Sequence, residues 1–312
     1  MYFDPSYFKE EERDGFVIKP MMKRAWAAQL EVLQVIDEIC KRHNIVYFAT
    51  FGTLLGAVRH GGFIPWDDDI DIGMRRKDFI RFQHYARQEL PEGFHLFSAY
   101  AGTNEQLIAR VLNSLSITTE PSFMEKFHGC PYAVGIDIFI FDNIPLHKEE
   151  EEIQCQLVSA TYALQQEWDS DSLSEEEKIE SLHQIEDLCK VKFTDDQPIR
   201  QQLLLLCDRL CAMFWDIDAK EISVILCFSV APRLRFSMNW YESIIEVPFD
   251  VTTIPIPIGY DNILTVHYGE NYMIPKQSHS HTYPFFKEQQ QTLFEEAQQM
   301  NIELPDYLKE VF

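Results

Sequence analysis

The chain has 312 residues, 46% of them hydrophobic and 13% aromatic, so it can build a sizeable core and disorder is not expected. Its net charge is −23, and no run of lysine and arginine forms a basic patch, which argues against a nucleic-acid partner. The seven cysteines are irregularly spaced without a C-x-x-C pair, which predicts reduced thiols in a cytoplasmic protein.

The two features that would predict export or membrane insertion are missing from the sequence pattern. Residues 1–14 lack the basic-then-apolar order of a signal peptide. The longest apolar run, residues 222–230, is too short to cross a bilayer. We therefore expect no transmembrane segment, which still allows transient contact with a membrane-bound acceptor.

The first half of the chain alternates predicted helices and strands. Hydrophobic periodicity predicts helices over residues 22–43, 53–59 and 76–90. Runs of β-branched and aromatic residues predict strands at 45–51, 69–74, 94–100, 107–112 and 132–141. This mixture indicates an α+β or α/β sheet domain.

The pattern changes after residue 147, which divides the chain into three predicted parts. Residues 1–147 form the sheet core, residues 148–235 a helical insertion or subdomain, and residues 236–312 a C-terminal segment that completes the site. Within the last part, 248–257 is proline-rich and extended, and helices are expected near 261–268 and 287–300. Cys207 and Cys211, four residues apart on an apolar helix, are expected in the core.

The segment with the strongest chemical signal is acidic. Four aspartates stand within five positions: Asp67, Asp68, Asp69 and Asp71. Because side chains alternate along a strand, Asp69 and Asp71 share one face while Ile70 and Ile72 share the other. Neighbouring carboxylates repel one another unless a cation lies between them, and oxygen ligands suit Mg²⁺ or Mn²⁺. A solvated turn does not need the alternating isoleucines, and a calcium loop needs glycine where Ile72 stands.

Three further groups of residues are candidates for the same site. Gly52 and Thr53 stand at a strand-to-helix turn, where free backbone N–H groups attract phosphate. Asp137, a charged residue inside an apolar strand, is the candidate third carboxylate, whereas Asp142 is expected to be a turn residue that faces water. The cations that are candidates to hold phosphate oxygens are Arg59, Arg110 and Lys276.

These residues resemble a known family. The run from Gly52 to Arg59, followed by Ile64-Pro65-Trp66 and the aspartates, is similar to the signature of the LicD family, which includes bacterial phosphocholine transferases, fukutin and fukutin-related protein. The segment around Asp137 and the C-terminal stretch from Pro255 to Pro275 resemble later blocks of that family. The helical middle of the chain shows no such resemblance.

The resemblance implies a nucleotidyltransferase-like fold, with a mixed sheet core flanked by helices and carrying a helical insertion. It implies Mg²⁺ or Mn²⁺ on Asp69, Asp71 and Asp137, with donor phosphate on Gly52 and Thr53. It implies transfer of a phospho-alcohol group, such as phosphocholine, from a CDP-linked donor (CDP-choline for example) to a glycan hydroxyl. The additional candidates are Trp66, Asp67, Asp68, His279 and His281.

Two other functions are compatible with the same residues. One is a true nucleotidyltransferase that acts on a small alcohol or phosphosugar, which only the reaction products distinguish. The other is a non-catalytic binding protein on the same fold, which the complete Asp-x-Asp pattern argues against.

Overall fold

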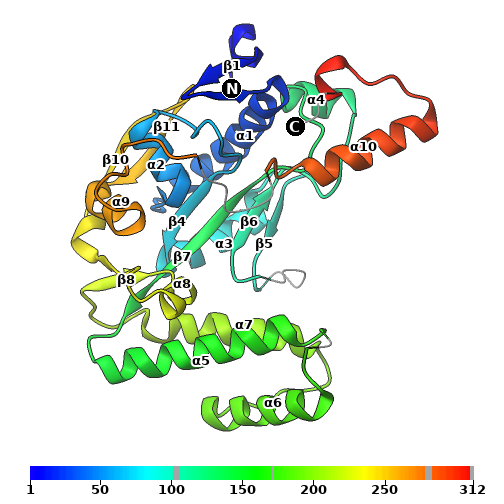
Figure 1. Cartoon of the computed structure of the whole chain (residues 1–312). Helices are drawn as coiled ribbons and strands as arrows, with labels where there is room; N and C mark the ends of the chain where they lie inside the picture. The colour runs from blue at the N-terminus through cyan, green and yellow to red at the C-terminus, as the bar shows by residue number, and fades with distance from the viewer. Residues whose placement is uncertain (101–105, 171, 278–282, 310–312) are drawn as a thin grey trace.

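The computed structural model describes residues 1–100, 106–170, 172–277 and 283–309. Its main sheet has the strand order β3-β4-β7-β6-β5, with β4 and β7 parallel and the other neighbours antiparallel. The bounds along this order are Phe48–Ala49, Asp71–Arg75, Gly135–Ile144, Ala109–Leu112 and His95–Phe97. This mixed sheet with its helices confirms the predicted α+β class (Figure 1).

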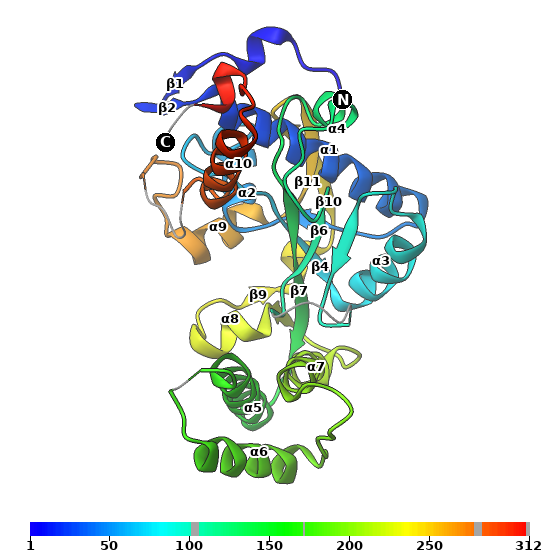
Figure 2. The ribbon, with the colours of Figure 1, turned by 90° about the vertical axis from the view of Figure 1, so that its right-hand side faces the viewer.

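Strand β7 connects two parts of the molecule. Its first residues pair with β4 on one side and β6 on the other. Its last three residues, from Asp142 to Ile144, pair instead with β8 (Glu221–Ser223), which pairs in turn with β9 (Phe236–Ser237). Figure 2 shows β7 running from the sheet down to the helices of the second part.

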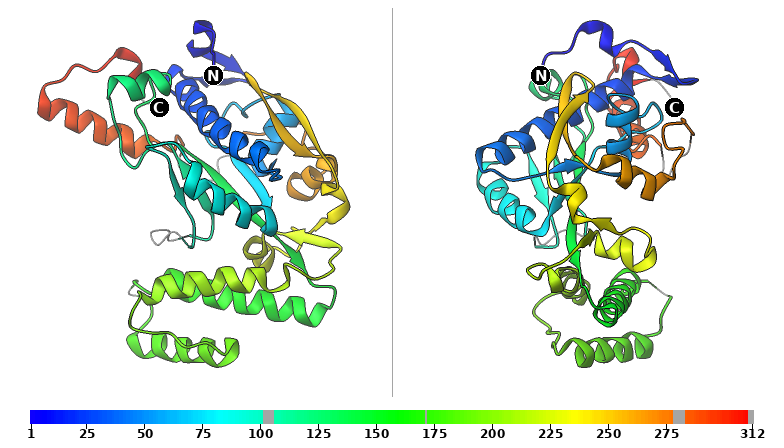
Figure 3. Two further views of the ribbon diagram at one scale, coloured as in Figure 1. Left: turned by 180° about the vertical axis from the view of Figure 1, so that it is seen from behind. Right: turned by 90° about the vertical axis from the view of Figure 1, so that its left-hand side faces the viewer.

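Helices α1 (Pro20–Arg42) and α3 (Arg76–Glu89) cover one face of the sheet (Figure 3). Pro20 opens α1 at a position where its missing N–H is not needed. One side of α1 is buried, with Trp26 and Leu30 almost fully enclosed. The short helix α2 (Phe51–Arg59) follows β3 directly and leads into the acidic segment. The sequence periodicity predicted all three helices to within a few residues.

The second part contains α5 (Lys148–Glu167), α6 (Glu175–Cys189), α7 (Ile199–Cys211) and α8 (Ile225–Val230). Their apolar faces form a hydrophobic cluster of their own, in which Val158, Leu203 and Cys207 are fully buried. Cys211 is buried in the same cluster, so both cysteines lie in the core as predicted. The region is not purely helical, because it also supplies β8 to the end of β7.

The remaining elements surround the main core. The N-terminal hairpin is β1 (Glu11–Arg13) with β2 (Phe16–Ile18), and the extended proline-rich segment forms a hairpin of β10 (Ile244–Phe249) with β11 (Thr252–Pro257). The other helices and 3₁₀ turns are η1 (Pro5–Phe8), α4 (Pro121–Lys126), η2 (Ala212–Phe214), η3 (Met238–Tyr241), α9 (Tyr260–Tyr268), α10 (Lys287–Met300) and η4 (Asp306–Leu308). In the described ranges, no helix combines the length and the apolar character that a bilayer span requires.

Asp142 contradicts its prediction as a water-facing turn residue. It lies inside β7 and is only 1% exposed. The strand continues beyond Asp137 because β8 pairs with it there. Arg76 donates two hydrogen bonds to Asp142, of 2.8 and 2.6 Å. This arginine is the partner that the buried charge of Asp142 requires.

Candidate functional site

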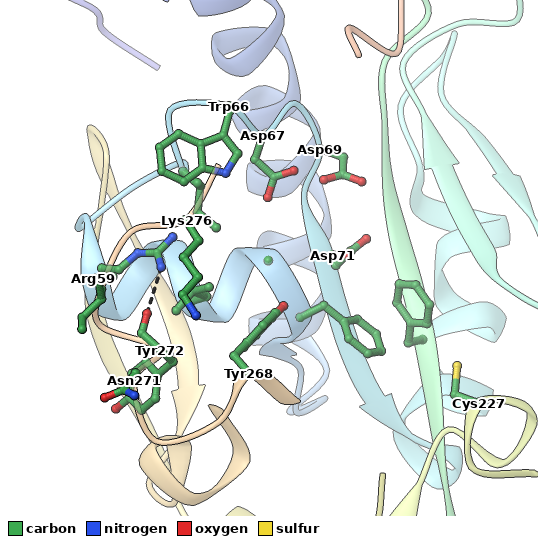
Figure 4. Close-up of a pocket in the computed structure, with 16 residues that line it drawn as sticks. Arg59, Trp66, Asp67, Asp69, Asp71, Cys227, Tyr268, Asn271, Tyr272 and Lys276 are labelled. Atoms are coloured by element: carbon green, nitrogen blue, oxygen red, sulfur yellow. Dashed lines mark hydrogen bonds between the residues drawn. The ribbon is translucent and has the colours of Figure 1, made fainter. Parts of the chain in front are cut away.

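A pocket of about 570 Å³ lies beside β4, within the range of small-ligand sites. We call it the reaction pocket. Figure 4 shows Asp67, Asp69 and Asp71 on one side of it, with Arg59 and Lys276 on the other. Its other lining residues are Phe51, Gly52, Leu55, Ile64, Trp66, Phe139, Cys227, Tyr268, Asn271, Tyr272 and Ile274. Segments distant in the sequence thus form one cavity.

The acidic loop, residues 64–70, is held in place by α1. The indole Nε1 of Trp26 donates to the carbonyl oxygen of Asp67 at 3.0 Å. The amide Nε2 of Gln29 donates to the carbonyl oxygen of Asp68 at 2.6 Å. Both donors are almost fully buried, so the loop backbone has a fixed position.

Asp68 has a different place from its neighbours. It is fully buried and does not line the reaction pocket. Its Oδ2 accepts a hydrogen bond of 2.5 Å from the backbone N–H of Phe285. Asp68 therefore connects the acidic loop to the C-terminal segment.

Gly52 and Thr53 both contact aspartates of the site. A Cβ atom at Gly52 would lie 2.5 Å from Oδ2 of Asp67, so glycine leaves the space that this carboxylate occupies beside the first turn of α2. A carboxylate is electrostatically favourable there because the helix N-terminus is partially positive. The hydroxyl of Thr53 accepts a 2.8 Å hydrogen bond from the backbone N–H of Asp71. These contacts position Asp67 and Asp71, and the phosphate role predicted for Gly52 and Thr53 stays a prediction.

Asp71, Asp137 and Arg110 form a row across three adjacent strands. Asp71 on β4 is the register partner of Asp137 on β7, and Asp137 is the register partner of Arg110 on β6. The guanidinium of Arg110 donates two hydrogen bonds to the Asp137 carboxylate, one of them 2.6 Å from Nη2 to Oδ2. Arg110 and Asp137 do not themselves line the reaction pocket.

The carboxylates on this side of the pocket repel one another. Burial raises the pKa of Asp71 well above its ordinary value, and the charges of Asp69, Asp137 and Asp67 raise it further. Carboxylate oxygens of Asp67, Asp68 and Asp69 lie within 4.8 Å of one another. Such crowding of oxygen donors suits a hard divalent cation. Of these residues, Asp67, Asp69 and Asp71 line the pocket. They could hold Mg²⁺ or Mn²⁺, and this metal site stays a prediction.

The opposite side of the pocket carries two cations. Nη1 of Arg59 donates to the carbonyl oxygen of Tyr272 at 2.8 Å, and its guanidinium lies 6.0 Å from the ring centroid of Trp66. Lys276 is exposed and has no ion-pair partner in the described part of the chain. Arg59, Lys276 and Trp66 therefore line the pocket, whereas Arg110 does not, and the roles predicted for them stay predictions. His279 and His281 lie outside the described residues.

Sequence reasoning did not identify every residue of the pocket. Cys227 comes from α8, in the helical part where no motif was recognised. Phe139 stands two residues after Asp137 on β7, which is the spacing that places both side chains on one face of a strand. The spacing from Asp137 could therefore have predicted Phe139 as a residue of the site, whereas no sequence pattern pointed to Cys227.

The fold and the pocket define an α+β protein in which three aspartates and two cationic side chains line opposite sides of one pocket. Residues 44–117 match the family model described as the LicD/FKTN/FKRP nucleotidyltransferase domain. Residues 44–117 are therefore similar to the domain of the LicD/FKTN/FKRP family, and the predicted resemblance is confirmed.

Relatives with curated descriptions match the same region. The chain is 35% identical over 117 residues to the lipopolysaccharide cholinephosphotransferase LicD of Haemophilus influenzae, which covers 37% of this chain and 42% of that protein. It is 38% identical over 48 residues to the human ribitol 5-phosphate transferase FKRP, covering 15% and 10% of the two chains. It is 42% identical over 66 residues to the protein RT0683 of Rickettsia typhi, covering 21% of each. The chain thus spans less than half the length of these relatives.

Proposed function

We propose that the protein is a transferase that moves a phospho-alcohol group, such as phosphocholine, from a CDP-linked donor to a glycan hydroxyl. The proposal rests on one observation: the two sides of the reaction pocket carry opposite charges. Asp67, Asp69 and Asp71 face Arg59 and Lys276 across the same cavity. A diphosphate with a bound divalent cation has both charges and would satisfy both sides.

The similar proteins support the class of group transferred. The Haemophilus influenzae relative is described as a cholinephosphotransferase and the human relative as a ribitol 5-phosphate transferase. Both names denote the transfer of an alcohol phosphate, although the alcohols differ. We therefore propose the phospho-alcohol class, with phosphocholine as the first candidate and a surface polysaccharide, teichoic acid or lipopolysaccharide precursor as the acceptor.

The chain's own residues account for the other requirements of this reaction. A bound Mg²⁺ or Mn²⁺ would neutralise charge on the donor diphosphate. Arg59 and Lys276 hold phosphate oxygens, and Arg59 is already fixed by Tyr272. The acceptor hydroxyl attacks the phosphorus as the bond to CMP breaks, and a pocket carboxylate accepts the hydroxyl proton. The aromatic rings of Trp66 and Tyr268 line the same cavity and suit a cationic head group such as choline.

A thermal-shift panel on the purified chain tests donor and metal together. The panel combines Mg²⁺ with CDP-choline, other CDP-alcohols, CTP, UTP or ATP. A ligand that binds only the folded state stabilises it by about 2.7 kcal/mol at 100 times its Kd. We expect a CDP-alcohol to raise the melting temperature, and to do so only when Mg²⁺ is present. Asp69→Asn and Asp71→Asn should lose this response, and Asp187→Asn on α6 should keep it as a matched control.

The products of turnover distinguish the proposal from its rivals. Release of CMP with labelled phosphocholine on the glycan supports it. Formation of pyrophosphate or a nucleotide adduct would show a true nucleotidyltransferase instead. A chain that binds no Mg²⁺ in calorimetry and turns over no donor would be a binding protein on the same fold.

A further inference from the structure

A second cavity, which we call the α3–α7 groove, lies on the side of the molecule that carries α3. Its volume is about 680 Å³, also within the range of small-ligand sites. Residues of α3 line one side at helical spacing, and the end of α7 with η2 and Trp215 lines the other. Among the described residues, none lines both this groove and the reaction pocket. The groove is therefore a separate site.

Two arginines give the groove a positive character. Arg87 on α3 is exposed, and Nη2 donates to the carbonyl oxygen of Tyr100 at 3.2 Å. Arg209 on α7 is exposed as well. Neither has a carboxylate partner in the described ranges, although the chain holds 50 acidic residues against 27 lysines and arginines. The groove therefore carries two guanidinium groups without an ion-pair partner among the described residues.

The groove's own acid does not neutralise these arginines. Among its described lining residues, Asp208 is the carboxylate, and it is only 4% exposed. Arg76 donates to both of its oxygens, at 2.8 and 3.0 Å, and the hydroxyl of Tyr100 donates to Oδ2 at 2.7 Å. With Asp208 satisfied in this way, the guanidinium charges of Arg87 and Arg209 remain for a ligand.

The rest of the groove is apolar and partly open. Ile80, one turn from Arg76 on α3, is 51% exposed, and Trp215 on the opposite side is 43% exposed. Phe79 lines the same cavity and is buried. A ligand of this groove therefore needs an anionic group for the arginines and an apolar body for Ile80 and Trp215.

We propose that the α3–α7 groove binds an organic phosphate, with the phosphate on Arg87 and Arg209 and the apolar part against Ile80 and Trp215. Guanidinium groups bind phosphate through paired N–H donors, and they remain charged at any physiological pH. The flat indole of Trp215 offers contact area at low entropic cost. This site is independent of the proposed transfer reaction.

Isothermal titration calorimetry of the full chain with phenyl phosphate, which has one phosphate and one apolar ring, tests the site. Arg87→Gln and Arg209→Gln should each weaken binding about tenfold, and the double variant should abolish it. Inorganic phosphate and phenol, as the two halves of the probe, should each bind more weakly than phenyl phosphate. Lys9→Gln, the same charge change on an exposed N-terminal residue, should leave the affinity unchanged.

Two further arms identify where the ligand binds and where it comes from. Arg59→Gln alters the reaction pocket and should leave phenyl phosphate binding unchanged; loss of binding there, with binding kept in Arg209→Gln, would overturn the proposal. Co-sedimentation compares phosphatidylcholine vesicles with and without phosphatidic acid. Capture by the acidic vesicles that the double variant loses identifies a lipid phosphate, whereas phenyl phosphate binding without vesicle capture identifies a soluble one. Binding of neither probe would refute the site.

Discussion

Asp71 and Asp137 are register partners on the parallel strands β4 and β7, so their carboxylates start from adjacent positions on the sheet. The two side chains then have different partners. Arg110 holds Asp137, whereas Asp71 faces the reaction pocket near Asp67 and Asp69. One carboxylate of this pair is thus neutralised by Arg110, whereas Asp71 has no ion-pair partner among the described residues. We propose that a divalent cation binds beside Asp71.

Replacing Asp71 by asparagine should separate function from stability. The variant keeps the shape of the side chain but removes a buried charge that three other aspartates repel. We expect transfer activity to fall by about 100-fold or more, as for loss of a group that stabilises the transition state, while the melting temperature without metal stays the same or rises. Activity assays and thermal unfolding check this, and a clear fall in the metal-free melting temperature would contradict the electrostatic account.

Arg110→Gln tests whether the ion pair between Arg110 and Asp137 contributes to the rate of transfer. Because Arg110 is 46% exposed, loss of the ion pair should lower the free energy of unfolding by no more than about 1 kcal/mol. Turnover should fall about tenfold or more, since Asp137 loses its fixed position next to Asp71. Arg110→Lys, which restores the charge without the paired N–H donors, should recover part of kcat. Unchanged kinetics in Arg110→Gln would show that the pair is only structural.

Two glycines of α2 provide a matched comparison. A Cβ at Gly52 would meet the carboxylate of Asp67 at 2.5 Å, and a Cβ at Gly56 would meet the backbone oxygen of Gly62 at the same distance. A side chain can move away more easily than a backbone, and alanine favours a helix. Gly52→Ala should therefore lose activity but keep its stability, whereas Gly56→Ala should unfold at lower denaturant. The reverse order in urea titrations would contradict this account.

The buried ion pairs of Arg76 connect α3 and β7 to α7. Asp208→Ala leaves part of the Arg76 guanidinium without a partner in a site that is 5% exposed. Loss of one partner of a buried pair typically costs about 3 to 5 kcal/mol, so urea denaturation should show a loss of that size. Asp169→Ala, which removes an exposed carboxylate paired with Arg200 at 3.4 Å, should cost less than about 1 kcal/mol.

His267 predicts a dependence of stability on pH. Burial against Phe236 and Phe51, together with the nearby Arg233, lowers the pKa of His267 from 6.5 to about 4. Between these two values the unfolded chain binds a proton that the folded chain does not, so stability is lost as the pH falls. The loss from this residue should approach about 3 kcal/mol by pH 4.

The variant His267→Gln, which has no titrating ring, isolates this contribution. Its free energy of unfolding should decline less than that of the wild type between pH 7 and pH 4, when both are measured by urea titration. Parallel pH profiles for the two proteins would show that His267 is not the source of the loss.

The sequence predicted the local elements well because their patterns are local. Periodic apolar residues identified α1, α2 and α3, and the helix at Lys287–Met300 begins and ends where it was expected. The ends of the strands were less accurate. The strand expected at residues 45–51 is limited to Phe48–Ala49, the two residues that pair with β4. The strand expected from residue 69 begins at Asp71. Strand ends depend on which neighbours pair with them, and a single sequence does not contain that information.

The sequence alone determined where the carboxylates of the pocket stand, because four aspartates lie within residues 67–71. The Gly-Thr turn predicts phosphate binding beside them, which stays a prediction. Tertiary structure alone decided how those residues are used. In the folded chain, Asp68 is buried and accepts a hydrogen bond from Phe285, and Asp137 forms an ion pair with Arg110. Cys227 and Lys276 line the same pocket although they belong to distant segments. The physical reason is that a charge takes its role from the partners and solvent around it, and those partners are chosen by strand register and packing between segments far apart in the chain.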